Sequence, residues 1–354
     1  NGKRSPMIQI GQTPSSGNPV VAGMFTGQGS QYLNMGMGLY ASSGFFRDQM
    51  NRCEEIVQQI RGQSLLEVIR GESVNGELSD TKWTQPALFS LEYAIAKWWI
   101  NRGVNFDFLI GHSVGEIAAA TVANVYSLES GLRLICRRAE LMQALPAGGA
   151  MAVLFADGMK LEPLLEPYSA EVAVAAFNGS ENTTVSGTDK MIRRIVENAA
   201  QNGIQSQTLD VSHAFHSPLM EPMLDEFTEF TSQLEHKAPD IPIVSNLTGK
   251  IETDNIFDAQ YWRDHVRQSV RFSDGVDRLV EEQVDVMIET GPAGTLIGMA
   301  RRCHPSQTVV AIPSLRKNET EDQHLATALG KAYVSGLKIN WSCEVDIPPT
   351  KVSL

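Results

Sequence analysis

One pattern constrains the fold of this 354-residue chain more than any other. The apolar run Phe106–Ile110 leads directly into Gly111-His-Ser-Val-Gly115, and an apolar helical segment begins at Glu116. Glycines permit the strained backbone angles and the close main-chain approach that a sharp strand-to-helix turn requires. Such a turn lifts Ser113 out at the end of a buried strand. The context therefore predicts a nucleophile elbow in an α/β fold rather than a chance match to Gly-x-Ser-x-Gly.

Apolar runs alternate with helical patterns along most of the chain, which is typical of a mostly parallel sheet covered on both faces. We therefore expect an α/β-hydrolase-like body. Its expected strands lie at 20–25, 106–110, 242–245, 284–289 and 309–312. Its expected helices lie at 38–69, 86–99, 116–123, 128–144, 293–302 and 319–336, with one within 268–282 and another after Pro218.

The middle of the chain has a different order of expected strands and helices. Its expected elements are strands at 150–155, 172–177, 182–186 and 206–211 and helices at 160–166 and 189–201. The order βαββαβ is that of a ferredoxin-like unit, so we expect a small subdomain inserted into the body. The predicted division is a linker remnant at 1–18, a large subdomain at 19–147 and 207–316, a small subdomain at 148–206 and a C-terminal linker at 317–354.

Charge and composition exclude several classes of protein. Lys plus Arg number 29 and Asp plus Glu 41, a net charge of −12, and no basic stripe marks a surface for nucleic acid or an anionic membrane. No apolar run is long enough to cross a membrane and no signal peptide is recognisable, so we expect a cytoplasmic protein. The absence of a starting Met favours a piece cut from a longer chain. The cysteines form no Cys-x-x-Cys pair and are expected to be free, buried thiols: Cys53, Cys136, Cys303 and Cys343.

A serine nucleophile needs a base, and the sequence offers seven histidines. His112 lies inside the turn, and His213 and His216 lie between an expected strand and an expected helix. Their His-x-x-His spacing has no third and fourth ligand beside it, so no metal site is expected. Asn182 and Asn246 begin glycosylation patterns, which mean little without secretion. The other histidines lie in charged stretches and are expected to be solvated: His236, His265, His304 and His324.

Six motifs occur in a fixed order along the chain. They are Thr26-Gly-Gln-Gly-Ser-Gln31, Thr84-Gln-Pro-Ala87, Gly111-His-Ser-Val-Gly-Glu116, Arg137-Arg-Ala-Glu-Leu-Met-Gln143, His213-Ala-Phe-His216 and Glu289-Thr-Gly-Pro292. In this order they resemble the malonyl-CoA:ACP transacylase family, and more closely the acyltransferase domains of modular polyketide synthases. The resemblance runs from about residue 19 to about residue 316, and the tail to Leu354 resembles the linker that follows such domains.

The resemblance implies a Ser–His dyad without a carboxylate. Ser113 would be the acyl nucleophile and His216 its base, in a ping-pong reaction through an acyl-Ser intermediate. The backbone N–H groups of Val114 and Gln28 would form the oxyanion hole. A backbone carbonyl orients the catalytic His in this family, and the matching position falls at His265.

The resemblance also implies an acyl pocket. Arg138 would hold the malonyl carboxylate, because a planar guanidinium pairs with a carboxylate through two hydrogen bonds and does so best away from water. Its neighbour Arg137 fits an ordinary surface charge better. Gln85 would line the floor, and the remaining substrate-binding residues would be His112, His213 and Phe215.

The substrates follow from the same resemblance. The His-Ala-Phe-His motif resembles the version associated with malonyl selection, because Phe215 would narrow the space beside C2 of the acyl chain. A hydroxymalonyl or aminomalonyl group, which carries a small polar substituent on C2, is not excluded. The donor would be a thioester on CoA or on a carrier protein. The acceptor would be the phosphopantetheine arm of an acyl carrier protein, with neighbouring synthase domains as further partners and no bound cofactor. A serine thioesterase or esterase is the alternative enzyme, and a non-catalytic docking scaffold is the alternative outside catalysis.

Overall fold

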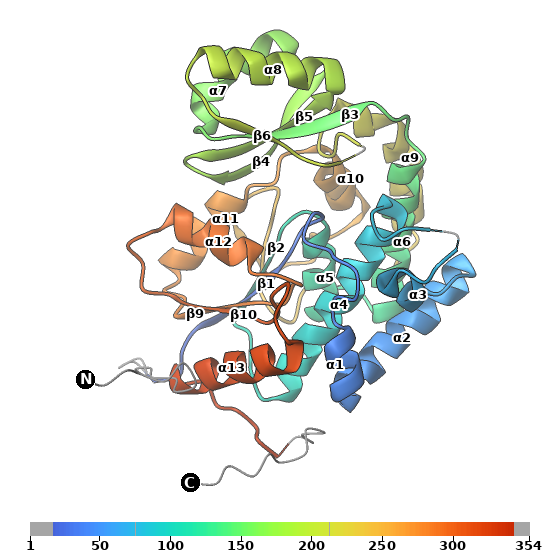
Figure 1. The fold of residues 1–354 in the computed structure, drawn as a ribbon, viewed down its shortest axis with the longest axis vertical. Helices are drawn as coiled ribbons and strands as arrows, with labels where there is room; N and C mark the ends of the chain where they lie inside the picture. Colours follow the sequence, from blue (N-terminus) through green and yellow to red (C-terminus); the bar gives the residue numbers. More distant parts are fainter. Residues whose placement is uncertain (1–16, 75, 212, 343–354) are drawn as a thin grey trace.

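The computed structural model describes residues 17–74, 76–211 and 213–342. Its centre is a six-stranded sheet in the order β10-β9-β1-β2-β7-β8 (Figure 1). All neighbouring strands are parallel except β7 and β8, which are antiparallel. The mostly parallel sheet expected from the sequence is therefore confirmed. The strands are β1 (Val21–Phe25), β2 (Phe108–Gly111), β7 (Ile243–Val244), β8 (Ile251–Glu252), β9 (Val286–Glu289) and β10 (Val310–Pro313).

Helices cover both faces of this sheet. Because successive side chains of a strand point to opposite faces, each strand contributes to two cores. Val21 and Phe25 of β1 belong to one core, together with α4 and α5, whereas Ala22 and Met24 belong to another, together with α11 and α12. The helices of the body are α1 (Met37–Ser42), α2 (Gly44–Arg61), α3 (Leu65–Arg70), α4 (Thr81–Asn101), α5 (Val114–Val122), α6 (Leu128–Gln143), α9 (Glu221–Thr231), α10 (Ala259–Arg267), α11 (Phe272–Glu281), α12 (Thr295–Cys303) and α13 (Glu321–Val334).

A second, smaller sheet stands above one end of the body (Figure 1). Its strand order is β4-β5-β3-β6, and every pair of neighbours is antiparallel. Two helices cover its outer face and bury a separate apolar core. In chain order the elements are β3 (Gly149–Leu154), α7 (Gly158–Leu165), β4 (Val172–Gly179), β5 (Asn182–Thr188), α8 (Asp189–Gln201) and β6 (Ser206–Thr208).

Two local expectations differ from the structure. The helix expected at 38–69 is divided into α1, α2 and α3, and Gly62 ends α2 in the left-handed conformation. Neither α10 nor β8 was predicted, so His265 was not expected on a helix. The segment 268–282 holds a helix as expected, and α11 begins at Phe272 because Val270 pairs in extended form with Ala176 of β4.

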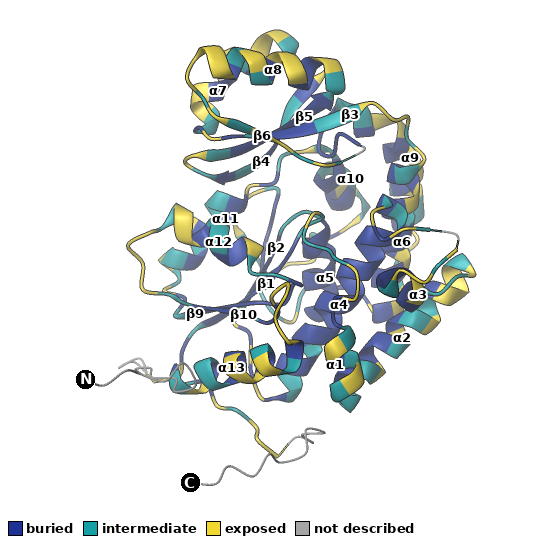
Figure 2. Cartoon of the chain, viewed as in Figure 1, coloured by how far each residue is buried: buried dark blue, intermediate teal, exposed yellow. Residues whose placement is uncertain are grey.

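Helix α13 lies in the segment predicted as a C-terminal linker, and it packs against the body. Leu325 and Leu329 join the main core, and the Glu321 carboxylate accepts hydrogen bonds from the backbone N–H groups of Gly36 and Leu39. Figure 2 shows exposed residues on the outer sides of α7, α8 and α13, while the central strands are buried. Most of the predicted N-terminal linker remnant lies outside the described residues.

The described cysteines are free thiols. Cys53 and Cys136 are buried and Cys303 is half-buried, whereas Cys343 lies outside the described residues. Within the described part of the chain, no helix is both long enough and apolar enough to cross a membrane.

Candidate active site

The predicted strand-to-helix turn is present between β2 and α5. Ser113 occupies its apex with φ 50° and ψ −115°, a strained conformation for a residue other than glycine. The flanking glycines are required by space: a Cβ on Gly111 would lie 2.1 Å from the backbone nitrogen of Glu116, and one on Gly115 would lie 2.2 Å from the carbonyl oxygen of Phe25. The elbow therefore tolerates no side chain at either position.

His216 is positioned as the base for Ser113. Its Nε2 lies 2.7 Å from Ser113 Oγ, and its Nδ1 lies 2.9 Å from the backbone carbonyl oxygen of Gln268. Since a carbonyl can only accept, Nδ1 carries the proton and Nε2 is left to accept from the serine hydroxyl. Burial, and then the positive charge of Arg138, hold the pKa of His216 well below its ordinary value. The imidazole is thus neutral at physiological pH and ready to take a proton.

The assignment of the orienting carbonyl to His265 is wrong, as is the expectation that this side chain is solvated. The carbonyl belongs to Gln268, the residue that follows α10, where an extended backbone turns it away from the helix. The His265 side chain is 1% exposed, and its Nε2 lies 3.4 Å from Glu116 Oε2 beneath the elbow. Buried residues of α10 at 261, 262, 265 and 266, preceded by the cap Asp258, form the one-sided pattern that could have revealed this helix.

The side chain of Arg138 on α6 lies beside Ser113 and His216. Its side chain is 1% exposed, Nη1 donates to Gln85 Oε1 over 2.8 Å, and Nη2 donates to Ser113 Oγ over 3.2 Å. Burial lowers the pKa of Arg138 to about 9, so it remains a cation at neutral pH. Among the described residues no carboxylate pairs with it. An anion in the cavity would therefore meet an unbalanced positive charge.

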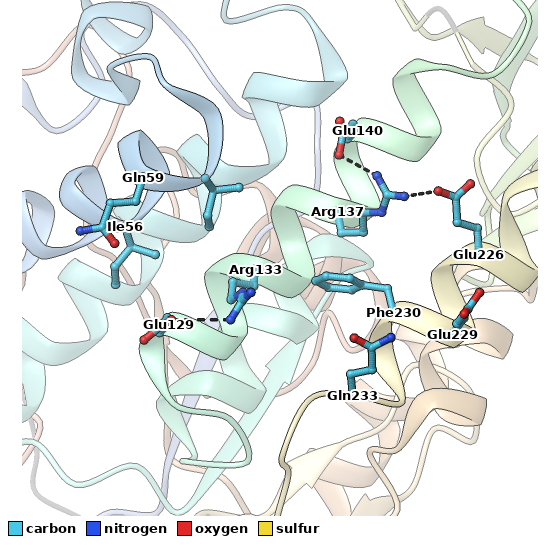
Figure 3. Close-up of a pocket in the computed structure, with 11 residues that line it drawn as sticks. Ile56, Gln59, Glu129, Arg133, Arg137, Glu140, Glu226, Glu229, Phe230 and Gln233 are labelled. Atoms are coloured by element: carbon cyan, nitrogen blue, oxygen red, sulfur yellow. Dashed lines mark hydrogen bonds and ion pairs between the residues drawn. The ribbon is translucent and has the colours of Figure 1, made fainter.

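Arg137 has the contrasting surface role expected for it. It pairs with Glu140 on its own helix and with Glu226 on α9, in a groove of about 630 Å³ between α2, α6 and α9 (Figure 3). Arg133 in the same groove lies 3.7 Å from Glu129. Among the described residues that line this groove, both arginines are paired with glutamates, in contrast to the unpaired Arg138 in the Ser113 cavity.

The Ser113 cavity has a volume of about 260 Å³ and is lined from both sheets. The small sheet supplies apolar residues such as Met151 and Val153 together with polar residues such as Asn178, whereas Ser113 and Arg138 come from the body. Of the residues expected to form the site, eight line this cavity: Gln28, Gln85, His112, Ser113, Val114, Arg138, Phe215 and His216. His213 and His265 do not line it.

Two of the histidines support the cavity wall. His112 Nε2 lies 2.8 Å from Oδ1 of Asn178 on β4, so it links the elbow to the small sheet. His213 is buried with Nε2 3.4 Å from the Leu145 carbonyl oxygen, and its ring packs beside Phe215. Within the described residues, no three His, Cys, Asp or Glu side chains come together as metal ligands.

A buried carboxylate that the sequence analysis missed holds the loop that carries Gln28. Glu92 of α4 is fully buried and accepts hydrogen bonds from the backbone N–H and the hydroxyl of Thr26. Gln85 Nε2 donates to Gln28 Oε1 over 3.4 Å, which connects the loop to the Arg138 side of the cavity. Burial raises the pKa of Glu92 well above its ordinary value. In the sequence, the one feature that could have revealed this role is the presence of an acidic residue within a largely apolar helix.

Comparisons with known proteins identify relatives over most of the chain. The acyl transferase domain family matches residues 24–339. The chain is 42% identical over 333 residues to polyketide synthase GfsB of Streptomyces halstedii. The aligned region covers 92% of this chain and 6% of that protein. The chain thus spans only a small part of the synthase that it matches.

Solved structures give the same picture. The acyltransferase domain from the second module of the salinomycin polyketide synthase matches with a TM-score of 0.89 and 40% identity, over 97% of this chain and 80% of that one. A malonyl-transacylase in complex with its type II acyl-carrier protein matches with a TM-score of 0.79 and 27% identity, over 88% of this chain and 99% of that one. The chain therefore belongs to the acyl transferase domain family and is an acyltransferase of the type found in modular polyketide synthases.

Proposed function

We propose that this acyltransferase moves a malonyl-type acyl group from a thioester donor to the phosphopantetheine thiol of an acyl carrier protein, through an ester on Ser113. The observation that carries the proposal is the 2.7 Å contact between Ser113 Oγ and His216 Nε2, in a cavity that also holds the buried Arg138 cation. The relative solved with its acyl-carrier protein supports the choice of acceptor.

In the first half of the reaction, His216 Nε2 takes the hydroxyl proton of Ser113 as Oγ attacks the thioester carbonyl carbon. The tetrahedral oxyanion accepts hydrogen bonds from the backbone N–H groups of Val114 and Gln28, each worth roughly 3 kcal/mol. Collapse breaks the carbon–sulfur bond, and the leaving thiolate takes the proton from His216. Ser113 then carries the acyl group as an ester.

The second half reverses the first with a different thiol. His216 takes the proton of the carrier's phosphopantetheine thiol, and the sulfur attacks the ester carbonyl carbon. The carbon–oxygen bond of the ester breaks and Ser113 Oγ recovers the proton. One thioester and one thiol are consumed and one of each is produced, so the exchange needs no oxidant, reductant or further cofactor.

The malonyl preference rests on charge and on space. The guanidinium of Arg138, held by Gln85, would pair with the free carboxylate of the acyl group. Phe215 forms the wall beside C2, and one extra methyl against such a wall costs about 1–3 kcal/mol. Malonyl is therefore the proposed acyl group, and malonyl groups with a small polar substituent on C2 are the alternatives. The donor thioester is on CoA or on a carrier protein.

The architecture belongs to the same proposal. The parallel sheet with the elbow supports a hydrolase-like body at 19–147 and 207–316, and the strand order of the small sheet supports a ferredoxin-like subdomain at 148–206. This subdomain would cover the acyl ester and exclude water. The remaining parts of the proposal are a linker at 1–18, a linker at 317–354 that packs on the body through α13, neighbouring synthase domains and a cytoplasmic location.

Intact-mass spectrometry tests the proposal. The protein is incubated with malonyl-, methylmalonyl-, hydroxymalonyl- and acetyl-CoA, and then with a holo acyl carrier protein. The expected result is a malonyl adduct on Ser113 that moves to the carrier, and no adduct on Ser113→Ala. An adduct that persists on Ser113→Ala overturns the nucleophile. Release of free malonate in place of carrier loading would identify a thioesterase.

A further inference from the structure

The side chain of Asn246 spans the nucleophile elbow from outside. It lies in the turn between β7 and β8 and is 1% exposed. Its Oδ1 accepts the backbone N–H of Ser113 over 2.7 Å, and its Nδ2 donates to the carbonyl oxygen of Gly111 over 2.8 Å. One amide thus binds the main chain on both sides of His112, at the point where the chain enters its strained conformation.

An amide matches both main-chain groups at this position. The Ser113 N–H needs an acceptor and the Gly111 carbonyl needs a donor, and the Asn side chain supplies both in one planar group. Both contacted groups are main-chain, so they hold the peptide planes that set the direction of the Ser113 side chain. The contact also occupies the N–H of Ser113 itself, which leaves the N–H of Val114 as the elbow's donor to an oxyanion.

Asn246 is itself fixed from two further directions. Its backbone N–H donates to Glu116 Oε2 over 3.0 Å, and its carbonyl oxygen accepts from the N–H of Arg271 over 2.8 Å. Arg271 ends the extended segment that begins at Gln268, whose carbonyl orients His216. Asn246 is therefore connected through short hydrogen bonds to the supports of both the nucleophile and the base.

We propose that Asn246 is a positioning residue for the acyl transfer: its side-chain amide holds the elbow so that Ser113 Oγ meets His216 Nε2 and the carbonyl of the thioester in one geometry. The inference rests on the proposed role of Ser113 as nucleophile. The same contacts argue against glycosylation at the Asn-x-Thr pattern that begins at Asn246, because a buried amide whose oxygen and nitrogen are both hydrogen-bonded is not accessible for glycan attachment.

The test uses Asn246→Ala and Asn246→Leu. The second variant keeps the approximate size and shape of the side chain but loses both the acceptor for Ser113 N–H and the donor to Gly111. Ser245→Ala is the matched control in the same turn, because Ser245 Oγ bonds Tyr261 and the turn but not the elbow. Two rates are measured for each variant: labelling of Ser113 by a fluorophosphonate, which needs no acyl carboxylate, and turnover with malonyl-CoA and holo carrier protein.

We expect both Asn246 variants to lose about 100-fold or more in labelling and in kcat, because a small misplacement of a reacting group costs that much, while KM for malonyl-CoA stays near the wild-type value. Ser245→Ala should keep a labelling rate close to wild type. A folded Asn246→Ala or Asn246→Leu protein with wild-type labelling overturns the inference, as does a loss that appears only as a raised KM. If the wild type is not labelled at Ser113, the proposed function fails before Asn246 is tested.

Discussion

Arg138 Nη1 donates to Gln85 Oε1 over 2.8 Å, so the buried cation is held by a neutral amide. Its other polar contact among the described residues is the hydroxyl of Ser113. A guanidinium held this way is fixed in position without having its charge cancelled, and burial strengthens its attraction for an incoming carboxylate. In the proposed function, this arrangement lets one side chain select a malonyl-type group beside the atom that reacts.

Replacement of Arg138 by Ala should abolish the preference for malonyl. We expect kcat/KM for malonyl-CoA to fall at least about 30-fold, equivalent to roughly 2 kcal/mol, because one partner of a buried charge pair is lost. Loading of acetyl-CoA should be unchanged or higher. Parallel loading assays with both thioesters measure the ratio.

The control for that experiment is Arg137→Ala on the same helix. Arg137 pairs with Glu140 and Glu226 at the surface, where such pairs contribute about 0–1 kcal/mol, so its removal should leave both substrates unaffected. Unchanged malonyl loading in Arg138→Ala would show that the carboxylate binds elsewhere.

The pH dependence of acylation should report a base with a low pKa. His216 must be neutral to accept the serine proton, and burial and the charge of Arg138 hold its pKa well below 6.5. We therefore expect kcat/KM for malonyl-CoA to be flat around neutral pH and to fall only on an acid limb with its midpoint below 6.5. A pH series with constant ionic strength measures it, and a midpoint at or above 6.5 would contradict the neutral, buried base described here.

The sequence predicted local features well and distant pairings poorly. The elbow and the alternation of strands and helices follow from local patterns whose spacing has a direct physical meaning. The Ser113–His216 pair spans distant parts of the chain, and only the resemblance to a known family implied it. The orienting carbonyl was placed three residues too early, because a main-chain group leaves no mark in a side-chain pattern. Glu92 and Asn246 were missed as site residues for a related reason: each acts on backbone groups far away in sequence, and only the fold brings them together.

Addition of a methyl group at Gly115 should destroy the elbow. The Cβ would lie 2.2 Å from the carbonyl oxygen of Phe25, and the backbone of β1 has no room to yield. We expect Gly115→Ala to lose acylation and to unfold at a lower denaturant concentration than the wild type. In the control Gly298→Ala on α12, the Cβ meets only Arg302 Nη1 at 3.9 Å, so stability should be equal or slightly higher. Equal stability of the two variants would contradict the close approach of β1 to the elbow.

The buried carboxyl of Glu116 should make stability fall as pH rises. Burial raises its pKa to about 8, above its ordinary 4.5, so the folded protein binds a proton that the unfolded chain releases. This contribution is fully present below pH 4.5 and is lost as pH rises through about 8. Between pH 6.5 and 9 the wild type should therefore lose stability relative to Glu116→Gln, by an amount of order a few kcal/mol. Nearby His265, whose pKa burial lowers, stays neutral in the folded protein over this window, and its titration in the unfolded chain is the same in both variants and cancels in the comparison. Denaturant unfolding at several pH values measures the difference, and a difference that does not change with pH would show that Glu116 is already ionised beneath the elbow.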